Sequence, residues 1–378
     1  MEPFKNLLNA GVVAAAGAHL QRVWPAFERQ RFEQLAVDGL DALEFKARAV
    51  HIAAALAACL PQDDFDVACT VLEASLAPRL EEGAEGGTTP RTSDAGLAGW
   101  IVWPMGEFVA RFGLQHPERA LAALHALTQR FTAEFAIRPL IAAHPDLAFA
   151  TLARWVSDPS PHVRRLVSEG SRPRLPWGLR LQALVADPTP TLPLLEALQD
   201  DPSEYVRRSV ANHLNDIAKD HPHRVADWIQ AHLPGAPPAR RTLLRHASRT
   251  LIKQGDACIL ALWGLGVPFD GEVAFSLSHT EVSVGDALAL ALHLQPRGST
   301  TQALEIDYLV HHVKANGQSS PKVFKGWRLQ LTAGEARALR KTHSLKPITT
   351  RRYHPGLHRV EVQINGRVVA EAAFVLRA

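Results

Sequence analysis

The stretch Asp158-Pro-Ser-Pro-His-Val-Arg-Arg-Leu-Val167 recurs about forty residues later as Asp201-Pro-Ser-Glu-Tyr-Val-Arg-Arg-Ser-Val210. Both copies follow the pattern D-P-S-x-x-V-R-R-x-V, and in each copy the pattern opens a run with helical spacing. A pattern of this length at this period is typical of a solenoid, in which helical repeats stack on one another. Both copies also carry polar residues that stacking alone does not require, so these residues are candidates for function.

Three helix starts are predicted where an Asp-Pro pair precedes a hydroxyl residue. Ser160, Thr189 and Ser203 each follow such a pair and precede a helical run. Their hydroxyls can cap free backbone N–H groups. Pro161 and Pro190 fit the first turn of a helix, where a missing N–H breaks no hydrogen bond. We therefore expect a helix to begin at each of these points.

Length and composition describe a folded protein with more than one structural unit. A chain of 378 residues is too long for one ordinary core, so two or three units are expected. Hydrophobic residues make up 47% and charged residues 21%, enough apolar surface to offset the entropy of ordering the chain. The formal net charge is only +3, so any affinity for nucleic acid has to come from a local basic patch.

The three cysteines, Cys59, Cys69 and Cys258, form no metal-binding or disulfide pattern. We therefore predict no structural zinc, no other cofactor and a reducing, cytoplasmic location. An apolar run near the start, Gly11–Ala18, imitates an export signal, but it is better explained as one helix that continues to Trp24. No apolar stretch approaches the length that spans a membrane, and no P-loop, nucleophile-elbow or zinc-protease motif occurs.

Helical spacing continues with one interruption to residue 264. Glu81–Asp94 is acidic, rich in glycine and without periodicity, which predicts a surface loop. Helices are expected from Trp100 onward, with the last of them around Pro222–His232 and Pro238–Leu262. We assign residues 1–264 to a helical-repeat domain.

Beyond residue 264 the period of the apolar residues changes to two, as in half-buried strands. Asn365-Gly366 predicts a type I′ hairpin turn between the last two strands. Residues 265–378 are therefore assigned to a small immunoglobulin-like β-sandwich that lacks a cysteine pair. The alternating runs are Val273–Leu277, Ala287–Leu294, Glu305–Val313, Trp327–Leu331 and Gly356–Ile364.

Two acids lie where helix electrostatics disfavour them. Glu169 falls in the last turn before Gly170, and Asp216 lies close to the end of its own helix, so each is near the negative end of a helix dipole. Asp216 continues a polar strip with Ser209 and Asn212, which we expect on the inner face of the solenoid. Acids near helix ends are also common on ordinary surfaces, so position alone leaves both interpretations open.

Glu134 is a weaker candidate by the same test. We expect it in the first turn of a helix capped by Thr132, where an acid is ordinarily stabilising. Pro139 is predicted to interrupt that helix one turn later and to open its carbonyls toward a groove. Helix electrostatics alone therefore give Glu134 no special role.

A basic, proline-rich segment surrounds Glu169. Arginines with one aromatic residue in a stiff loop suit contacts to a phosphate backbone and a stacking surface. The alternative is a solvated loop in which Trp177 fills the core. The segment contains Arg164, Arg165, Arg172, Arg174, Arg180 and Trp177, and two further basic runs are Arg240–Arg249 and Arg351–His354.

Four long motifs resemble the AlkC branch of the HEAT-like DNA alkylation-repair glycosylases. They span most of the helical part, and gapless motifs of this length are far more specific than a short consensus. The strand-rich tail is similar to the immunoglobulin-like domain found in one subset of that family. The motifs are Glu2–Asn9, Gly99–Phe108, Phe131–Pro139 and Val163–Trp177.

The resemblance implies a DNA glycosylase that hydrolyses the N-glycosidic bond of small cationic alkylated bases, such as 3-methyladenine and 3-methylcytosine. It also implies that the base is not flipped into a deep pocket, which departs from the usual behaviour of glycosylases. The active-site acids of the family fall on Glu134, Glu169 and Asp216, and its indole falls on Trp177. Phe135, Arg165 and Arg172 occupy neighbouring motif positions and are expected to contact DNA.

Under this resemblance the partner is double-stranded DNA that contains alkylated bases. We expect a monomer, because DNA must reach the groove, and no role at a membrane. Asp216 would position water and stabilise the sugar cation, Glu169 would face the sugar or the lesion, and Glu134 would hold the cationic base. Two alternatives remain: a helical-repeat scaffold that binds another protein, and a DNA-binding relative that has lost catalysis.

Overall fold

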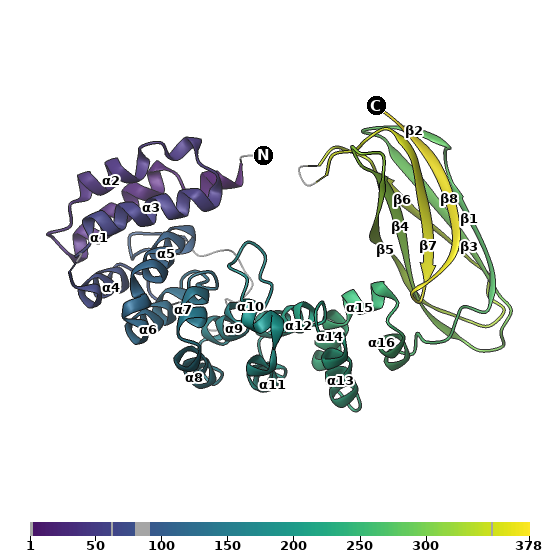
Figure 1. Ribbon diagram of the computed structural model, residues 1–378, viewed down its shortest axis with the longest axis horizontal. Coiled ribbons are helices and arrows are strands. Elements are labelled where there is room, and N and C mark those ends of the chain that lie inside the picture. Colours follow the sequence, from purple (N-terminus) through teal and green to yellow (C-terminus); the bar gives the residue numbers. More distant parts are fainter. Residues whose placement is uncertain (1–2, 62, 80–90, 349–350) are drawn as a thin grey trace. The chain divides into compact units, whose positions relative to one another are not determined.

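The computed structural model describes residues 3–61, 63–79, 91–348 and 351–378 (Figure 1). The predicted loop Glu81–Asp94 therefore lies mostly outside the described residues. Helices occupy the described chain up to Leu262, and strands begin at Gly271. No helix within the described ranges is long and apolar enough to cross a membrane.

The chain folds into two compact units. One unit runs through His221 and also contains Gly235–Ala247. The other consists of Pro222–Pro234 and Ser248–Ala378. The change from helices to strands falls near the predicted boundary after residue 264, but three of the last helices belong to the unit that holds the strands.

The first unit is built from short helices that stack side by side in two rows (Figure 1). One row contains α3 (Phe45–Cys59), α5 (Val102–Phe112), α7 (Ile137–Ala143), α9 (Pro161–Gly170), α12 (Glu204–Ile217) and α14 (Pro238–Ala247). The other contains α4 (Phe65–Ala74), α6 (Pro117–Thr128), α8 (Pro145–Trp155) and α11 (Leu192–Leu198). The remaining helices are α1 (Ala10–Val23), α2 (Arg29–Val37) and α10 (Gln182–Ala186), and the 3₁₀ turns are η1 (Phe4–Leu7), η2 (Leu40–Ala42), η3 (Gly99–Ile101), η4 (Gly113–Gln115) and η5 (Thr189–Thr191).

Aspartate carboxylates, not hydroxyls, prepare the starts of the two repeat helices. Asp158 Oδ1 accepts a hydrogen bond from the backbone N–H of Ser160, and Asp201 Oδ1 accepts one from Ser203, each at 2.8 Å. The hydroxyls of the two serines make no capping hydrogen bond. The predicted hydroxyl caps are therefore wrong at both sites, because the aspartate two residues earlier closes the turn.

The third predicted start differs more. The N–H and hydroxyl of Thr189 both bond to Asp187 Oδ1, at 3.0 and 2.5 Å, and Thr189 begins the 3₁₀ turn η5. The α-helix that follows, α11, begins only at Leu192. Pro161, in contrast, occupies the first turn of α9 as predicted, where its missing N–H has no helical partner to lose.

The first arginine of each repeat pattern bonds to backbone carbonyls at the start of its own helix. Arg164 Nη1 donates to the carbonyls of Asp158 and the following proline, at 2.8 and 2.9 Å. Its Nε and Nη2 donate to the carboxylate of Asp201 in the next repeat, at 2.6 and 3.0 Å. Arg207 bonds to the carbonyls of Asp201 and its proline in the same way. Because Asp201 also prepares the start of α12, one buried carboxylate joins two repeats.

The second unit contains α13 (Pro222–His232), α15 (Arg249–Gln254), α16 (Ala257–Leu262) and a sandwich of two sheets (Figure 1). One sheet has the order β1 (Gly271–Leu277), β3 (Ala287–Pro296), β6 (Arg337–Ser344). The other has the order β2 (Glu281–Ser283), β8 (Arg367–Arg377), β7 (Gly356–Ile364), β4 (Gln302–Val313), β5 (Ser319–Leu331). The predicted mainly helical fold with an immunoglobulin-like sandwich at its end is therefore confirmed.

The core of the sandwich and its last turn follow from the sequence. Leu288, Tyr308 and Phe374 are buried between the sheets. Asn365 and Gly366 join β7 to β8 with φ angles of 48° and 75°. Both values lie in the left-handed region that a type I′ turn requires, so the predicted hairpin is confirmed.

Arg164→Ala is expected to lower the free energy of unfolding by roughly 2–4 kcal/mol, because it leaves the buried carboxylate of Asp201 without its cation. The two side chains of this pair are only 13% and 3% exposed. The matched control is Arg208→Ala, whose partner is Glu204 and whose side chain is 69% exposed, so its loss is expected to stay within about 0.5 kcal/mol. Urea unfolding at neutral pH measures both variants. Equal losses of unfolding free energy would contradict a stabilising role for the Arg164–Asp201 pair.

Candidate active site

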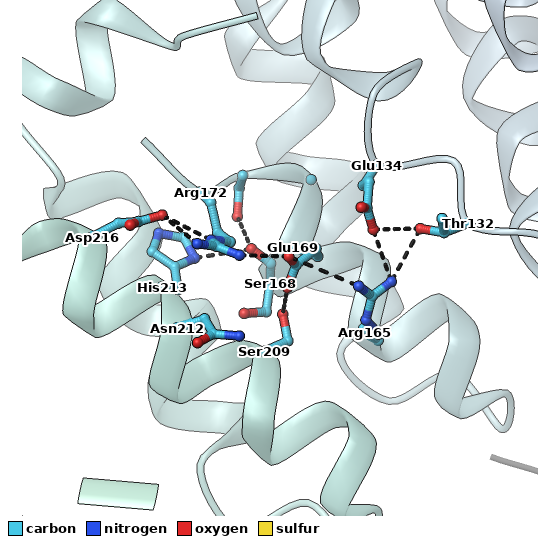
Figure 2. A network of polar contacts seen from close by, with 12 residues as sticks. Thr132, Glu134, Arg165, Ser168, Glu169, Arg172, Ser209, Asn212, His213 and Asp216 are labelled. Carbon is cyan, nitrogen blue, oxygen red and sulfur yellow. Dashed lines mark hydrogen bonds and ion pairs between the residues drawn. The ribbon is translucent and has the colours of Figure 1, made fainter. Parts of the chain in front are cut away.

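Glu134 lies in the turn before α7, outside the helix. Because α7 begins at Ile137, Pro139 lies in its first turn, where proline breaks no helical hydrogen bond. Thr132 caps no helix: its hydroxyl donates to Glu134 Oε2 at 2.5 Å. The predicted first-turn position, the Thr132 cap and the Pro139 interruption are thus wrong. The turn instead brings the carboxylate to Arg165 on α9 (Figure 2).

Glu169 and Asp216 lie at the ends of neighbouring helices, as predicted. Glu169 is in the last turn of α9, and Asp216 is the penultimate residue of α12. They are only 5% and 1% exposed, and Glu134 is 9% exposed. Burying a carboxylate is unfavourable unless it is paired. The three acids are therefore not ordinary surface acids near helix ends.

Two arginines connect the three acids into one chain of ion pairs (Figure 2). Arg165 Nη1 lies 2.8 Å from Glu134 Oε2, and its Nη2 lies 3.8 Å from Glu169 Oε1. Arg172 Nη1 lies 2.6 Å from the same oxygen of Glu169. The Nε and Nη2 atoms of Arg172 lie 2.8 and 2.7 Å from Asp216 Oδ2. The structure thus joins an acid in the turn before α7 to acids at the ends of α9 and α12.

Other polar side chains occupy most of the remaining carboxylate oxygens. Ser209 Oγ donates to Glu169 Oε2 at 2.6 Å, and Lys219 Nζ donates to Asp216 Oδ1 at 2.8 Å. Glu134 Oε2 is held by Thr132 and Arg165, whereas Glu134 Oε1 has no polar partner among the described residues. Glu134 therefore keeps one oxygen available to a ligand.

The arginines keep Glu169 ionised. Burial opposes the charged form, but the guanidiniums of Arg165 and Arg172 and hydrogen bonds from Ser209 and Arg172 outweigh it, so the pKa of the Glu169 carboxyl lies below its ordinary value. The charged form of Arg172 is stabilised in the same way. Burial opposes its charge, but Glu169 and Asp216 raise its pKa above the ordinary value. Glu169 is consequently an anion at neutral pH.

His213 is a buried, uncharged side chain next to the acids. Its Nδ1 donates to the carbonyl of Ser168 at 2.9 Å, and the side chain has no exposed surface. Burial, together with the charge of Arg172, lowers the pKa of His213 to about 3. The imidazole therefore adds no positive charge to the cluster at neutral pH.

The two aromatic candidates are placed differently. Phe135 follows Glu134 and packs against Trp103, with ring centroids 5.4 Å apart. Trp177 lies on the loop between α9 and α10 and is 80% exposed. It therefore does not fill the core. Unlike Arg165, it is no part of the polar network of the acids as far as the chain is described.

Several arginines of the basic segment form ion pairs with acids of the same chain. Arg164 binds Asp201, and Arg174 donates to both oxygens of Asp220, each at 2.6 Å. In the later basic run, Arg240 pairs with an acid of the preceding repeat. These pairs compete with any contact to phosphate.

Sequence analysis missed three residues that shape the site. Lys219 was detectable in principle, because it lies three residues beyond Asp216 and can therefore share its helix face. Tyr205 occupies in the second repeat the position of His162 in the first, and its ring lies 4.7 Å from the guanidinium carbon of Arg165. His213 carried no signal, since its role depends on packing between α9 and α12.

Family comparisons agree with this architecture. Residues 128–251, which contain all three acids, match the family described as DNA alkylation repair enzyme. Residues 272–378 match the family described as the C-terminal Ig-like domain of the uncharacterised protein YhaZ. The fold and the site thus define a DNA alkylation-repair enzyme with an appended immunoglobulin-like domain.

Two relatives extend over the whole chain. The uncharacterized protein YhaZ of Bacillus subtilis (strain 168) is 35% identical over 97% of this chain and 98% of its own length. The structure of Pseudomonas fluorescens alkylpurine DNA glycosylase AlkC, bound to DNA containing an abasic site analog, is 33% identical, covers 100% of both chains and gives a TM-score of 0.89. The chain belongs to the AlkC-type family of HEAT-like DNA alkylation-repair glycosylases.

His213→Asn is expected to flatten the dependence of stability on pH. The pKa of His213 is about 3 in the folded protein and about 6.5 in the unfolded chain. Its contribution is therefore fully present above pH 6.5 and is lost as the pH falls toward 3, because the unfolded chain then binds a proton that the folded protein does not. Asparagine keeps a donor for the carbonyl of Ser168 but does not titrate.

Urea unfolding at a series of pH values from about 7 to 4.5 tests this expectation. The wild type should lose stability faster than the variant, by up to about 1.4 kcal/mol per pH unit below pH 6.5. Contributions from other titrating groups are shared by both proteins and cancel in the difference. Parallel curves would show that His213 is not held neutral by burial.

Proposed function

We propose that this protein is a DNA N-glycosylase of base excision repair that acts as a monomer on double-stranded DNA. Its substrates are small cationic alkylated bases of the 3-methyladenine and 3-methylcytosine class, which it releases without flipping them into a deep pocket. The observation that carries the proposal is the single ion-paired cluster of Glu134, Glu169 and Asp216. The family assignment and the DNA-bound relative support it.

A cationic alkylated base is already a good leaving group. When its bond to C1′ breaks, the bonding pair goes to the base, which leaves as a neutral molecule, and the sugar becomes an oxocarbenium-like cation. Water then adds to C1′ and gives a proton to a carboxylate. The enzyme has to stabilise the sugar cation and position the water, but it does not have to protonate the base.

Asp216 and Glu169 suit these two tasks. We assign Asp216 to positioning the water and stabilising the sugar cation, and Glu169 to the sugar or the lesion. Hydrogen bonds from Arg172 and Ser209 fix Glu169, and two nitrogens of Arg172 hold Asp216 Oδ2. Anions fixed in advance in a site of low dielectric constant stabilise a nearby cation without further reorganisation.

Glu134 suits the base itself. Its Oε2 atom is fixed by Thr132 and Arg165, while Oε1 has no partner in the described part of the chain. An anionic oxygen that is positioned on one side and open on the other can pair with the positive charge of an alkylated base. A neutral base offers it no such charge, so this contact selects for cationic lesions.

The substrate has to compete with cations that already bind the acids. Lys219 is the easiest of them to displace, because its side chain is 43% exposed and holds Asp216 by one contact of 2.8 Å. Arg172 is 8% exposed and is held by two acids. A DNA phosphate that draws Lys219 away leaves Asp216 with unbalanced negative charge toward the sugar.

The remaining candidates contact the DNA around the lesion. Arg165, with 17% of its side chain exposed, and Arg172 approach the nucleotide from within the network. Trp177 packs on the deoxyribose or on the face of the base, where an electron-rich ring favours a cation. Phe135 borders Glu134 and contributes apolar surface.

Asp216→Asn and Glu169→Gln are each expected to slow base release roughly a hundredfold or more, because each removes a charge that stabilises the sugar cation. Release of 3-methyladenine from methylated duplex DNA, measured in single turnover, gives the rate. Asp220→Asn is the matched control, since Asp220 pairs with Arg174 outside the cluster. Its rate should stay within about twofold of wild type.

Folded variants with wild-type rates would contradict the assigned roles. A wild-type protein that binds methylated duplex DNA in a mobility-shift assay but frees no base would be a DNA-binding relative without catalysis. A protein that neither binds nor releases would be a helical-repeat scaffold. Either outcome would overturn the proposed function.

A further inference from the structure

Trp177 has a strained backbone on an exposed loop. Its φ angle is +64°, in the left-handed region that a bulky side chain rarely adopts. The indole is 80% exposed, so packing of the ring does not hold the residue in this conformation. Contacts to the backbone of the loop have to do so.

Two cations from other helices hold the carbonyls of this loop. Lys46 of α3 donates through Nζ to the carbonyl of Trp177 at 3.2 Å. Arg138 of α7 donates through Nε to the carbonyl of Leu179. Nη1 of Arg138 also donates to the carbonyl of Gly170, at 2.8 Å. The loop is thereby fixed at Gly170, where it begins, and at the carbonyls on either side of Gly178.

Arg138 is an unusual residue to find in this position. It has no exposed surface, and its hydrogen-bond partners among the described residues are carbonyls, not carboxylates. Burial, and then the charge of Arg172, lower the pKa of Arg138 to about 10. A buried guanidinium that contacts no carboxylate directly is unfavourable unless its hydrogen bonds compensate for the water it has lost.

The loop also rests directly on Arg138. A Cβ atom added to Gly178 would lie 3.3 Å from both Cδ and Nε of Arg138, and 3.1 Å from Leu175. A side chain at this position would therefore require the loop or Arg138 to move by a few tenths of an ångström. Glycine at this position therefore allows the arginine to reach the carbonyl next in the chain.

We propose that Lys46 and Arg138 form a cationic clamp that fixes Trp177 in its exposed orientation, so that both act as positioning residues for base excision. This inference rests on the proposed function. Because Gly170 follows Glu169, Arg138 fixes the end of the helix that carries that acid as well as the loop. The clamp thus sets where the indole stands relative to the acids, and stacking on a nucleotide needs such a fixed position.

Fluorine NMR of the full chain tests the clamp without DNA. The eight tryptophans are replaced by 5-fluorotryptophan, and the resonance of Trp177 is identified by its loss in Trp177→Phe. Lys46→Met is expected to shift or broaden this resonance. Lys5→Met is the matched control, because it removes only an exposed ion pair with Glu44 at the same end of α3, and it should leave the resonance unchanged.

Kinetics test whether the clamp positions Trp177 for the reaction. Lys46→Met should slow single-turnover base release about five- to tenfold, the effect of one ordinary solvent-exposed hydrogen bond. The same substitution should have no effect in a Trp177→Ala background, because Lys46 acts through that residue. Arg138→Lys keeps the charge but lacks the planar fork that bonds to two carbonyls at once, so it should also move the resonance. Thermal unfolding checks that this variant is folded.

An unchanged Trp177 resonance in both Lys46→Met and Arg138→Lys would overturn the clamp. A rate loss in Lys46→Met that persists without the indole would overturn the positioning role. A wild type that releases no base would overturn the proposed function, while the resonance would still decide whether the clamp exists.

Discussion

The guanidinium of Arg172, shared between Glu169 and Asp216, is the interaction on which the rest of the site depends. Two carboxylates buried side by side repel each other, and burying both charges is unfavourable in the absence of a cation. Arg172 removes that repulsion and, because it bonds to both acids, fixes the ends of α9 and α12 with respect to each other. Arg165 extends the same alternation of charges to Glu134. A cluster of anions can therefore be preformed inside a folded protein, ready to stabilise a cation that arises during a reaction.

A comparison of the two repeats shows which arginines serve the repeat structure and which one belongs to the acid cluster. In both copies the first arginine of the pair bonds to the carbonyls at the start of its own helix. The second arginine differs: Arg165 lies between Glu134 and the ring of Tyr205, whereas Arg208 pairs with Glu204 on the surface. Since each repeat contacts mainly its neighbours, a polar residue becomes functional when the neighbour supplies its partner.

Local rules predicted much of this fold. The repeat period, the positions of Glu169 and Asp216 near helix ends and the Asn365-Gly366 turn depend on residues close in sequence, and the structure confirms them. Strand β6 escaped detection because Arg337–Ser344 consists mostly of polar residues and lacks the expected alternation. The serine caps failed because a nearby aspartate competes for the same turn.

The ion pairs could not be predicted, because they join residues far apart in the chain. Position near a helix end suggested that something favours Asp216, but only the fold shows that Arg172, forty-four residues away, does so. The sequence predicts a helix at Glu134, whereas the turn that holds it is set by its contacts with Thr132 and Arg165. The strained backbone of Trp177 likewise has its supports on other helices.

We propose that the acid cluster is complementary to a positive charge on the sugar, and a comparison of two abasic-site analogues tests this most directly. A duplex with a pyrrolidine, which is cationic at neutral pH, is compared with one that carries an uncharged tetrahydrofuran at the same position. The protein is predicted to bind the cationic analogue at least about tenfold more tightly, and Asp216→Asn to abolish that preference. Equal dissociation constants for the two duplexes in the wild-type protein would contradict the account.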